Sequence, residues 1–225
     1  MRRANRASRC RSRPARRSAD TRLFILGATG KTGTTIVAQA IERGHAVTTF
    51  GRSPFAGDAT RKITGNPMNI AELVAALPGH DAVLSVLGAR GLGRSSVRAD
   101  AARATVGAMS IARVPRLIIL SSALLDTHTG GLTRFLSRTL LRNIPTDQQA
   151  METVVMQSDI DWTILRPPMT NNGPLMTRYE VITGSAPNDA RGMKMSRSDV
   201  AHMMLDIAER GGHSRQIVWL RGVKA

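Results

Sequence analysis

Aromatic side chains, cysteine and long apolar runs are all scarce in this chain of 225 residues. Aromatic residues make up only 3% of the sequence, which argues against a stacking platform for single-stranded nucleic acid. The one cysteine, Cys10, cannot form an internal disulfide or a zinc cluster, and we expect a reducing, cytoplasmic setting. No apolar run approaches the ~20 residues that cross a bilayer, so we expect no membrane association.

Acidic residues are also scarce, and the resulting positive charge is uneven. There are 16 of them against 32 lysines and arginines, which gives a net charge of +16. Residues 1–20 hold eight arginines and one aspartate, so this lead carries +7 and leaves +9 for the rest. Because the lead has almost no large apolar side chains, it cannot offset the entropy cost of folding and is predicted to be disordered.

The origin of this arginine-rich lead stays open. Arg2 and Arg3 are similar to a twin-arginine export signal, but no apolar stretch follows them, so we do not expect export. A transit peptide would also be rich in arginine and serine, but it should form an amphipathic helix. The other interpretations are an unstructured extension, a misassigned start, or a tether to nucleic acid or another acidic surface.

Residues 21–225 are predicted to form a single α/β domain, since one core of this kind runs to roughly 250 residues. Strand-like and helix-like segments alternate, which predicts a Rossmann-type, doubly wound parallel sheet. Strands are expected at residues 22–26, 46–50, 62–64, 81–87, 116–120, 162–165 and 216–220. Helices are expected at residues 31–43, 69–77, 95–113, 132–141, 147–158 and 198–209, with a hairpin-like loop around 178–183.

The connection between the first strand and the first helix reads Gly27-Ala28-Thr29-Gly30-Lys31-Thr32-Gly33. In this context Gly27 permits a sharp turn, and Gly30 lets the backbone approach a pyrophosphate at the helix N-terminus. Gly33 lets the helix pack closely on the strand. The hydroxyls of Thr29 and Thr32 add hydrogen-bond donors. The pattern therefore predicts a phosphate site of a dinucleotide.

This motif is not a nucleotide-triphosphate loop. Lys31 follows Gly30, but a P-loop needs four residues between its glycines and a Gly-Lys-Ser/Thr ending. We therefore count Lys31 among the residues of a dinucleotide site. The alternative is a tight strand–helix connection without a ligand, although three glycines in one connection cost backbone entropy for no evident packing reason.

The end of the second strand predicts which dinucleotide is bound. An acidic residue there would bind the ribose hydroxyls of NAD, but the sequence reads Phe50-Gly51-Arg52-Ser53. Arg52 is suited to hold the 2′-phosphate of NADP through a charge-assisted contact. The alternative is a solvated arginine in an arginine-rich protein. With no acid nearby, the sequence favours NADP(H) as the cofactor.

With these motifs in place, the chain resembles the atypical short-chain dehydrogenases/reductases of the NAD(P)H-binding, NmrA-like group, and among them the NADPH-dependent flavin reductases, also called biliverdin-IXβ reductases. The similarity runs from about residue 23 to residue 218. Besides the glycine turn and Arg52, its carriers are the segments 81–83, 87–90 (Leu-Gly-Ala-Arg), 121–123 (Ser-Ser-Ala), 161–168 (Asp-Trp-Thr-Ile-Leu-Arg-Pro-Pro) and 196–201.

The resemblance implies a set of site residues at the carboxyl ends of the strands. Gly27, Thr29, Gly30, Thr32 and Arg52 would hold the adenosine and the phosphates, and Leu87 and Gly88, with Arg90 near them, would line the adenine and ribose. Ser121 and Ser122 would lie beside the nicotinamide, and Pro167, Pro168 and Met169 would form its far wall. The sequence departs from the family pattern at three further positions: Asn66 replaces an acid, and Gln148 and Met169 replace histidines.

The sequence lacks the Tyr-x-x-x-Lys pair that ordinary short-chain dehydrogenases use as proton donor. The only tyrosine, Tyr179, follows the sixth predicted strand and has no lysine at that spacing. Ketone reduction is therefore disfavoured, whereas flavins, quinones and bilins accept hydride and take a proton from water or a weak donor. Ser122 is our catalytic candidate, as an orienting hydroxyl; the alternative is a serine that only ends a buried strand. Glu152 could serve as a helix-borne carboxylate, but we expect it to lie on a solvated helix face.

The histidines are scattered without metal-ligand spacing, so no metal site is expected. Two functions follow as hypotheses. The first is an NADPH-dependent oxidoreductase that transfers hydride to a flavin, bilin or quinone-like acceptor. The alternative is an NADP(H)-sensing, NmrA-like regulatory protein without turnover. In both cases the expected partner is a small molecule rather than nucleic acid, and the protein is expected to be a monomer or small homo-oligomer.

Overall fold

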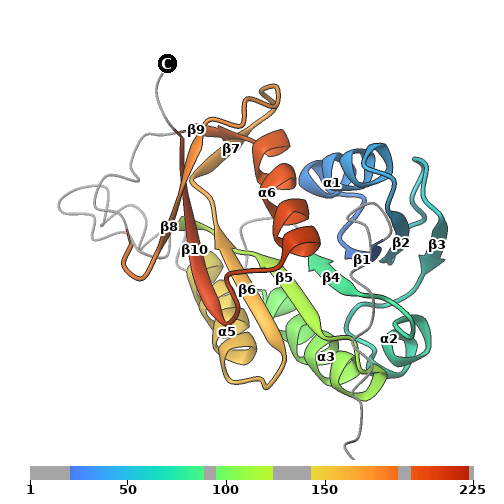
Figure 1. The fold of residues 1–225 in the computed structure, drawn as a ribbon. Helices are drawn as coiled ribbons and strands as arrows, with labels where there is room; N and C mark the ends of the chain where they lie inside the picture. The colour runs from blue at the N-terminus through green and yellow to red at the C-terminus, as the bar shows by residue number, and fades with distance from the viewer. Residues whose placement is uncertain (1–20, 89–94, 124–142, 187–193, 223–225) are drawn as a thin grey trace, which may run out of the picture.

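An eight-stranded sheet with helices on both faces forms the centre of the molecule (Figure 1). The computed structural model describes residues 21–88, 95–123, 143–186 and 194–222. The sheet contains β1 (Arg22–Leu26), β2 (Ala46–Gly51), β3 (Arg61–Thr64), β4 (Ala82–Ser85), β5 (Arg116–Leu120), β6 (Asp161–Arg166), β8 (Tyr179–Thr183) and β10 (Gln216–Gly222). A second sheet pairs β7 (Met169–Asn171) with β9 (Lys194–Ser196).

The strand order is β3-β2-β1-β4-β5-β6-β10-β8. The first six strands are parallel to their neighbours and follow the order of a doubly wound dinucleotide-binding sheet. β10 adds to β6 in parallel, and β8 closes that edge antiparallel to β10. The predicted fold class, a single Rossmann-type α/β domain, is confirmed.

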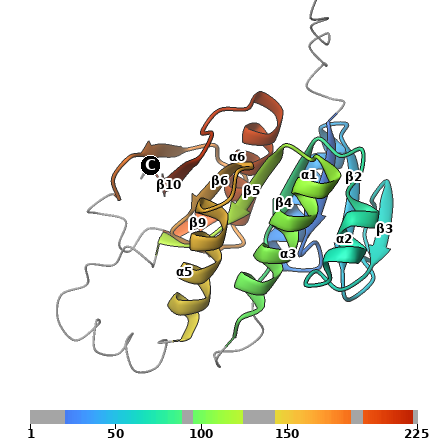
Figure 2. The same ribbon diagram turned by 90° about the horizontal axis from the view of Figure 1, so that it is seen from below.

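The helices are α1 (Lys31–Glu42), α2 (Ile70–Ala76), α3 (Val97–Ala112), α5 (Asn143–Met156) and α6 (Arg197–Arg210). α1 and α6 cover one face of the sheet, and α2, α3 and α5 cover the other, as Figure 2 shows from below. Among the helices of the described ranges, none has the length and apolarity that crossing a bilayer requires.

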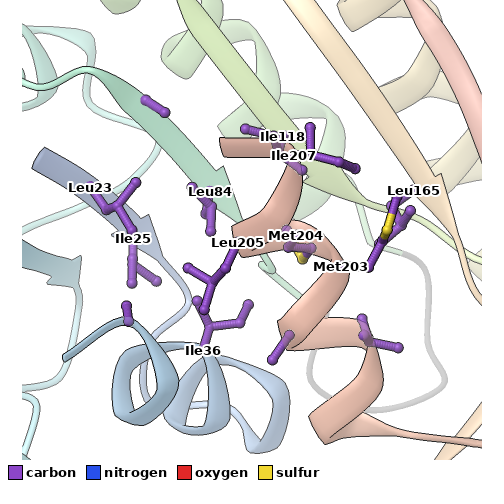
Figure 3. Close-up of a cluster of buried hydrophobic side chains, with 14 of the residues drawn as sticks. Leu23, Ile25, Ile36, Leu84, Ile118, Leu165, Met203, Met204, Leu205 and Ile207 are labelled. Carbon is purple, nitrogen blue, oxygen red and sulfur yellow. The ribbon is translucent and has the colours of Figure 1, made fainter. Parts of the chain in front are cut away.

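Successive side chains of a strand point to opposite faces of the sheet, which explains why helices cover both faces. Leu23 and Ile25 of β1 belong to the cluster that packs on α1 and α6 (Figure 3), whereas Phe24 and Leu26 belong to the cluster on α2, α3 and α5. All four side chains are fully buried. A strand with apolar residues on both sides needs a helix layer on each side, since burying a leucine contributes about 1.5–3 kcal/mol.

One local prediction differs from the structure, two short strands were not predicted, and two further predictions fall outside the described residues. The residues around 178–183 were expected to form a hairpin-like loop, but Tyr179–Thr183 is a strand of the main sheet. The strands β7 and β9, three residues each, were not predicted. The helix expected at residues 132–141 and the lead 1–20 lie outside the described residues.

Candidate functional site

A cavity of about 430 Å³ lies at the carboxyl ends of β1, β2 and β4, which is the position where open α/β sheets bind ligands. Its volume falls in the range typical of small-molecule sites. The lining residues from these strand ends are Gly27, Ala28, Thr29, Gly30, Lys31, Thr32, Gly33, Thr49, Phe50, Gly51, Arg52, Ser53, Val86, Leu87 and Gly88. Phe55, Ile63, Pro67, Thr170 and Arg197 complete the wall.

The backbone of the glycine turn packs so closely that side chains would not fit at Gly27 and Gly33. Gly27 has φ +85°, a conformation that L side chains rarely adopt. A Cβ on Gly33 would lie 2.1 Å from the carbonyl oxygen of Gly27, so helix α1 and the turn are in direct backbone contact. The N–H of Gly30 donates to the same carbonyl at 3.0 Å. The turn is therefore a tight cradle of backbone atoms, and side chains at Gly27 or Gly33 would fill it.

The N-terminus of α1 is open toward this cradle. Its N-cap, Gly30, provides no side-chain hydrogen bond, and the first turn holds no acidic residue. The first intrahelical acceptor, Gly30 O, is used by Thr34 N, so the N–H groups of residues 31–33 have no partner within the helix. Such an end attracts an anion, because unpaired N–H groups and the helix dipole both favour negative charge.

Three cationic side chains and no acidic ones line the cavity. Lys31 and Arg52 come from the first β-α-β unit, and Arg197 comes from the start of α6. Within the described residues, Arg52 has no hydrogen bond or ion pair and its side chain is exposed at the end of β2. The cradle, the open helix end and these cations together fit a phosphorylated dinucleotide such as NADP(H).

A buried polar cluster lies at the ends of β5 and β6, and we call Ser121, Gln148, Glu152 and Arg166 the Glu152 cluster. Ser121 Oγ donates to Glu152 and accepts from Gln148 Nε2 at 3.1 Å. Arg166 forms a two-point ion pair with Glu152, one contact being Nε to Oε1 at 3.0 Å. All four residues are at most 8% exposed, and Glu152 is only 2% exposed. The expectation that Glu152 lies on a solvated helix face is therefore wrong.

The next residues along β5 and β6 are tied together by backbone hydrogen bonds. Ser121 N donates to Leu165 O at 2.8 Å, and Ala123 N donates to Pro167 O at 3.0 Å. Ser122 lies between these two links and is half-buried, whereas Met169 is 64% exposed. The ends of both strands are thus held rigidly, with Ser122 between the two connections.

The single tyrosine of the chain, Tyr179, contacts a histidine away from the cavity. Tyr179 Oη lies 3.0 Å from His202 Nδ1, in a position joining β8 to α6 and outside the cavity lining. Burial, followed by the charges of Asp206 and Asp199, raises the pKa of Tyr179 to about 12. A phenol that holds its proton so firmly is a poor acid at neutral pH. The described residues also contain no group of His, Cys, Asp and Glu side chains that would hold a metal ion.

Residues 27–210 match the family model described as NAD(P)H-binding. The chain belongs to this NAD(P)H-binding family. That match begins at the first glycine of the turn, directly after β1, and ends at the last residue of α6.

Several solved structures share the fold of this chain. A candidate exported protein from Burkholderia pseudomallei is 26% identical, with a TM-score of 0.74 over 89% of this chain and 99% of that one. A candidate NADH-flavin reductase from Streptococcus pneumoniae is 22% identical, with a TM-score of 0.75 over 90% and 100%. A short-chain dehydrogenase/reductase from Veillonella parvula in complex with NADP is 22% identical, with a TM-score of 0.73 over 89% and 94%.

The site residues that the sequence of this NAD(P)H-binding protein predicted fall into two groups, those that line the cavity and those that do not. The lining group is Gly27, Thr29, Gly30, Lys31, Thr32, Gly33, Arg52, Leu87 and Gly88. Outside the lining are Asn66, Ser121, Ser122, Gln148, Pro167 and Met169, and Arg90 lies outside the described residues. Asn66 accepts a hydrogen bond from Met68 N at 3.1 Å, and its neighbour Pro67 faces the cavity.

Sequence reasoning missed two lining residues from the far half of the chain, Thr170 and Arg197. They reach the cavity because β7 pairs with β9, with Thr170 opposite Met195 and Asn171 opposite Ser196. No local pattern marks this pairing. The only signal in the sequence for Arg197 was its place in the segment 196–201, which the family resemblance had already quoted.

Proposed function

We propose that this NAD(P)H-binding protein is an NADPH-dependent oxidoreductase that transfers hydride to a flavin, bilin or quinone-like acceptor. The observation that carries the proposal is the pairing of a positively charged dinucleotide cavity with the absence of a tyrosine acid. The cavity has three cations and no carboxylate, and the only tyrosine of the chain, on β8, is hydrogen-bonded to His202 of α6.

Arg52 supports NADPH over NADH. It follows the last residue of β2, and no acidic residue lines the cavity to bind a free 2′-hydroxyl. A guanidinium with no partner among the described residues is free to bind a phosphate through two charge-assisted hydrogen bonds. The cofactor site would therefore hold the pyrophosphate at the N-terminus of α1 and the 2′-phosphate at Arg52.

The nicotinamide end of the site would lie at the ends of β5 and β6. When bound, NADPH supplies the hydride. A ketone would become an alkoxide as the hydride arrives and would need an acid beside it, whereas a conjugated ring system spreads the charge and takes its proton from water. Ser121 is hydrogen-bonded within the Glu152 cluster. We assign Ser122, the half-buried residue that follows it at the end of β5, to orienting the acceptor.

The test is steady-state oxidation of NADPH, followed at its absorbance maximum, with FMN, riboflavin, a short-chain quinone and a bilin as acceptors. We expect slow turnover with at least one of these acceptors and none above background with simple secondary alcohols or ketones. Brisk ketone reduction would contradict our interpretation of the missing tyrosine, since no acid in the described site would support it.

The second candidate is an NADP(H)-sensing regulatory protein that binds the dinucleotide without turnover. The Glu152 cluster favours it, because the polar groups at the ends of β5 and β6 bond one another instead of pointing to a substrate. Tight NADPH binding with no oxidation in the presence of any flavin, quinone or bilin would select this candidate. A cytoplasmic location and a monomeric or small homo-oligomeric state are predictions common to both candidates.

A further inference from the structure

Arg197 brings a cation from the C-terminal half of the chain to the cavity. It is the first residue of α6, directly after β9, and it lines the cavity together with Thr170 of β7. All other lining residues lie between positions 27 and 88. Elements that follow β6 therefore contribute to the cavity wall.

The packing of α6 fixes on which side of the glycine turn Arg197 lies. α6 packs against both α1 and β5, and Gln39 Nε2 of α1 donates to Ser198 O at 3.0 Å. In the sheet, β5 lies on the far side of β1 from β2. Arg197 thus reaches the cavity from the side of β5, whereas Arg52 reaches it from the end of β2.

The charge of Arg197 is not neutralised by a carboxylate in the described residues. Its side chain donates to Asn172 Oδ1, a neutral acceptor outside the cavity lining. The acid in the first turn of α6, Asp199, is already used: it accepts from Ser196 Oγ at 2.7 Å and from Met176 N and Thr177 N at 2.9 and 2.8 Å. Arg197 is therefore oriented by a neutral partner and keeps its full charge for the cavity.

We propose that Arg197 is a second arginine of the cofactor site, which binds the pyrophosphate of the dinucleotide from the side of β5, beside the N-terminus of α1. The proposal rests on the cofactor part of the proposed function. It assigns different tasks to the two arginines: Arg52 discriminates between NADP and NAD through the 2′-phosphate, whereas Arg197 contacts a group that both dinucleotides share. Arg197 then raises the affinity for both without changing the preference.

Calorimetric titration of NADP⁺ and NAD⁺ into the full chain tests this assignment. In R197A, we expect the Kd for each dinucleotide to rise about tenfold, as loss of one charge-assisted phosphate contact predicts, with the ratio of the two Kd values unchanged. In R52A, the ratio should collapse. R197K, which keeps a point charge, should fall between R197A and the wild type.

Two control variants separate the charge from its surroundings. R210A removes an exposed arginine at the other end of the same helix and should leave both affinities within about twofold of the wild type. N172A removes the hydrogen bond that tethers Arg197 but keeps the cation, and it should retain most of the affinity. Thermal melts without ligand establish that each variant is folded.

Several results would overturn the assignment. Unchanged affinities in R197A, with normal binding by the wild type, would mean that Arg197 only tethers Asn172. A loss confined to NADP⁺ would move Arg197 to the 2′-phosphate, and an equal loss in N172A would assign the effect to the tether. If the wild type binds neither dinucleotide, the proposed cofactor function itself fails, which is a different outcome from unchanged affinity in R197A.

Discussion

At the scale of single residues, we propose that Arg52 determines the preference for NADPH over NADH. Its guanidinium lies at the carboxyl end of β2 without a partner among the described residues, and no carboxylate lines the cavity. We predict that the wild type binds NADPH at least about tenfold more tightly than NADH and that R52A abolishes the preference, as one phosphate–arginine contact would require. Equal affinities of the wild type for both cofactors would refute this role.

The two serines at the end of β5 should respond differently to substitution. S122A is predicted to lower turnover with a flavin or quinone while leaving the Kd for NADPH nearly unchanged, because its proposed role concerns the reacting complex. S121A removes a donor to the buried Glu152 carboxylate and should cost about 1–3 kcal/mol of folding free energy. Kinetics and denaturant titration of both variants measure these effects, and equal loss of stability in S122A would contradict the separation.

Site residues could be predicted from the sequence where a local motif places them at the cavity, but not where contacts between distant segments do so. The turn from Gly27 to Gly33 and Arg52 belong to one β-α-β unit, so local motifs were sufficient to find them. Arg197 arrives through the pairing of β7 with β9, which depends on contacts between distant segments. Glu152 was misjudged because a carboxylate is usually solvated, and its partner Arg166 lies on a different element.

At the scale of elements, the turn between α2 and β4 contains a histidine that makes the fold sensitive to acid. His80 Nδ1 lies 2.8 Å from Leu77 O and Nε2 lies 2.8 Å from Thr48 Oγ1, so the neutral ring bridges the end of α2 to β2. Its edge also packs on the ring of Phe24. Burial, opposed in part by the hydrogen bond to Leu77 O, lowers the pKa of His80 below its ordinary value.

The sign of the pH dependence follows from that shift. The unfolded chain binds a proton at His80 near pH 6.5, whereas the folded chain resists it, so stability should fall as the pH drops below about 6.5. We predict that H80Q is less stable than the wild type at pH 8 but loses less stability between pH 7 and pH 5.5. Denaturant midpoints at each pH measure this, and parallel curves for the two proteins would disprove it.

A second acid-sensitive contact should act in a lower pH range and serves as the comparison. Hydrogen bonds from Arg43 and His45 outweigh burial and lower the pKa of Glu209 from its ordinary value of 4.5. Its contribution to stability is therefore complete above about pH 4.5 and is lost as the pH falls further. E209Q should lower the free energy of unfolding by a constant amount above about pH 4.5 and flatten its pH dependence only below that value, which distinguishes it from H80Q.

The elements that sequence reasoning predicted are those with a strong local pattern. β1 and β5 have the bounds that were expected, because five consecutive apolar-rich residues between turn signals read clearly as buried strands. β7 and β9 have three residues each, which is too short for any periodicity to appear. β8 was read as a loop because its residues are mostly exposed and its partner β10 lies more than 30 residues later in the chain.

At the scale of the whole molecule, two groups of positively charged residues can be compared. One lies at the cavity, where Lys31, Arg52 and Arg197 gather around the open end of α1. The other is the lead of residues 1–20, with eight arginines. The first set is positioned by strands and helices and is suited to bind one defined anion. The second has no such framework in its sequence, so its charge would act only through long-range, salt-sensitive attraction.

We therefore predict that deleting residues 2–20 leaves the Kd for NADPH and the thermal midpoint of the protein essentially unchanged. The lead has almost no apolar side chains to bury, so it should contribute little to the folded state. Calorimetry and thermal melts on the full-length and shortened chains, at low and at physiological salt, make the comparison. A drop of several degrees on truncation would show that the lead packs on the domain, and weaker NADPH binding only at low salt would show that its charge reaches the cavity.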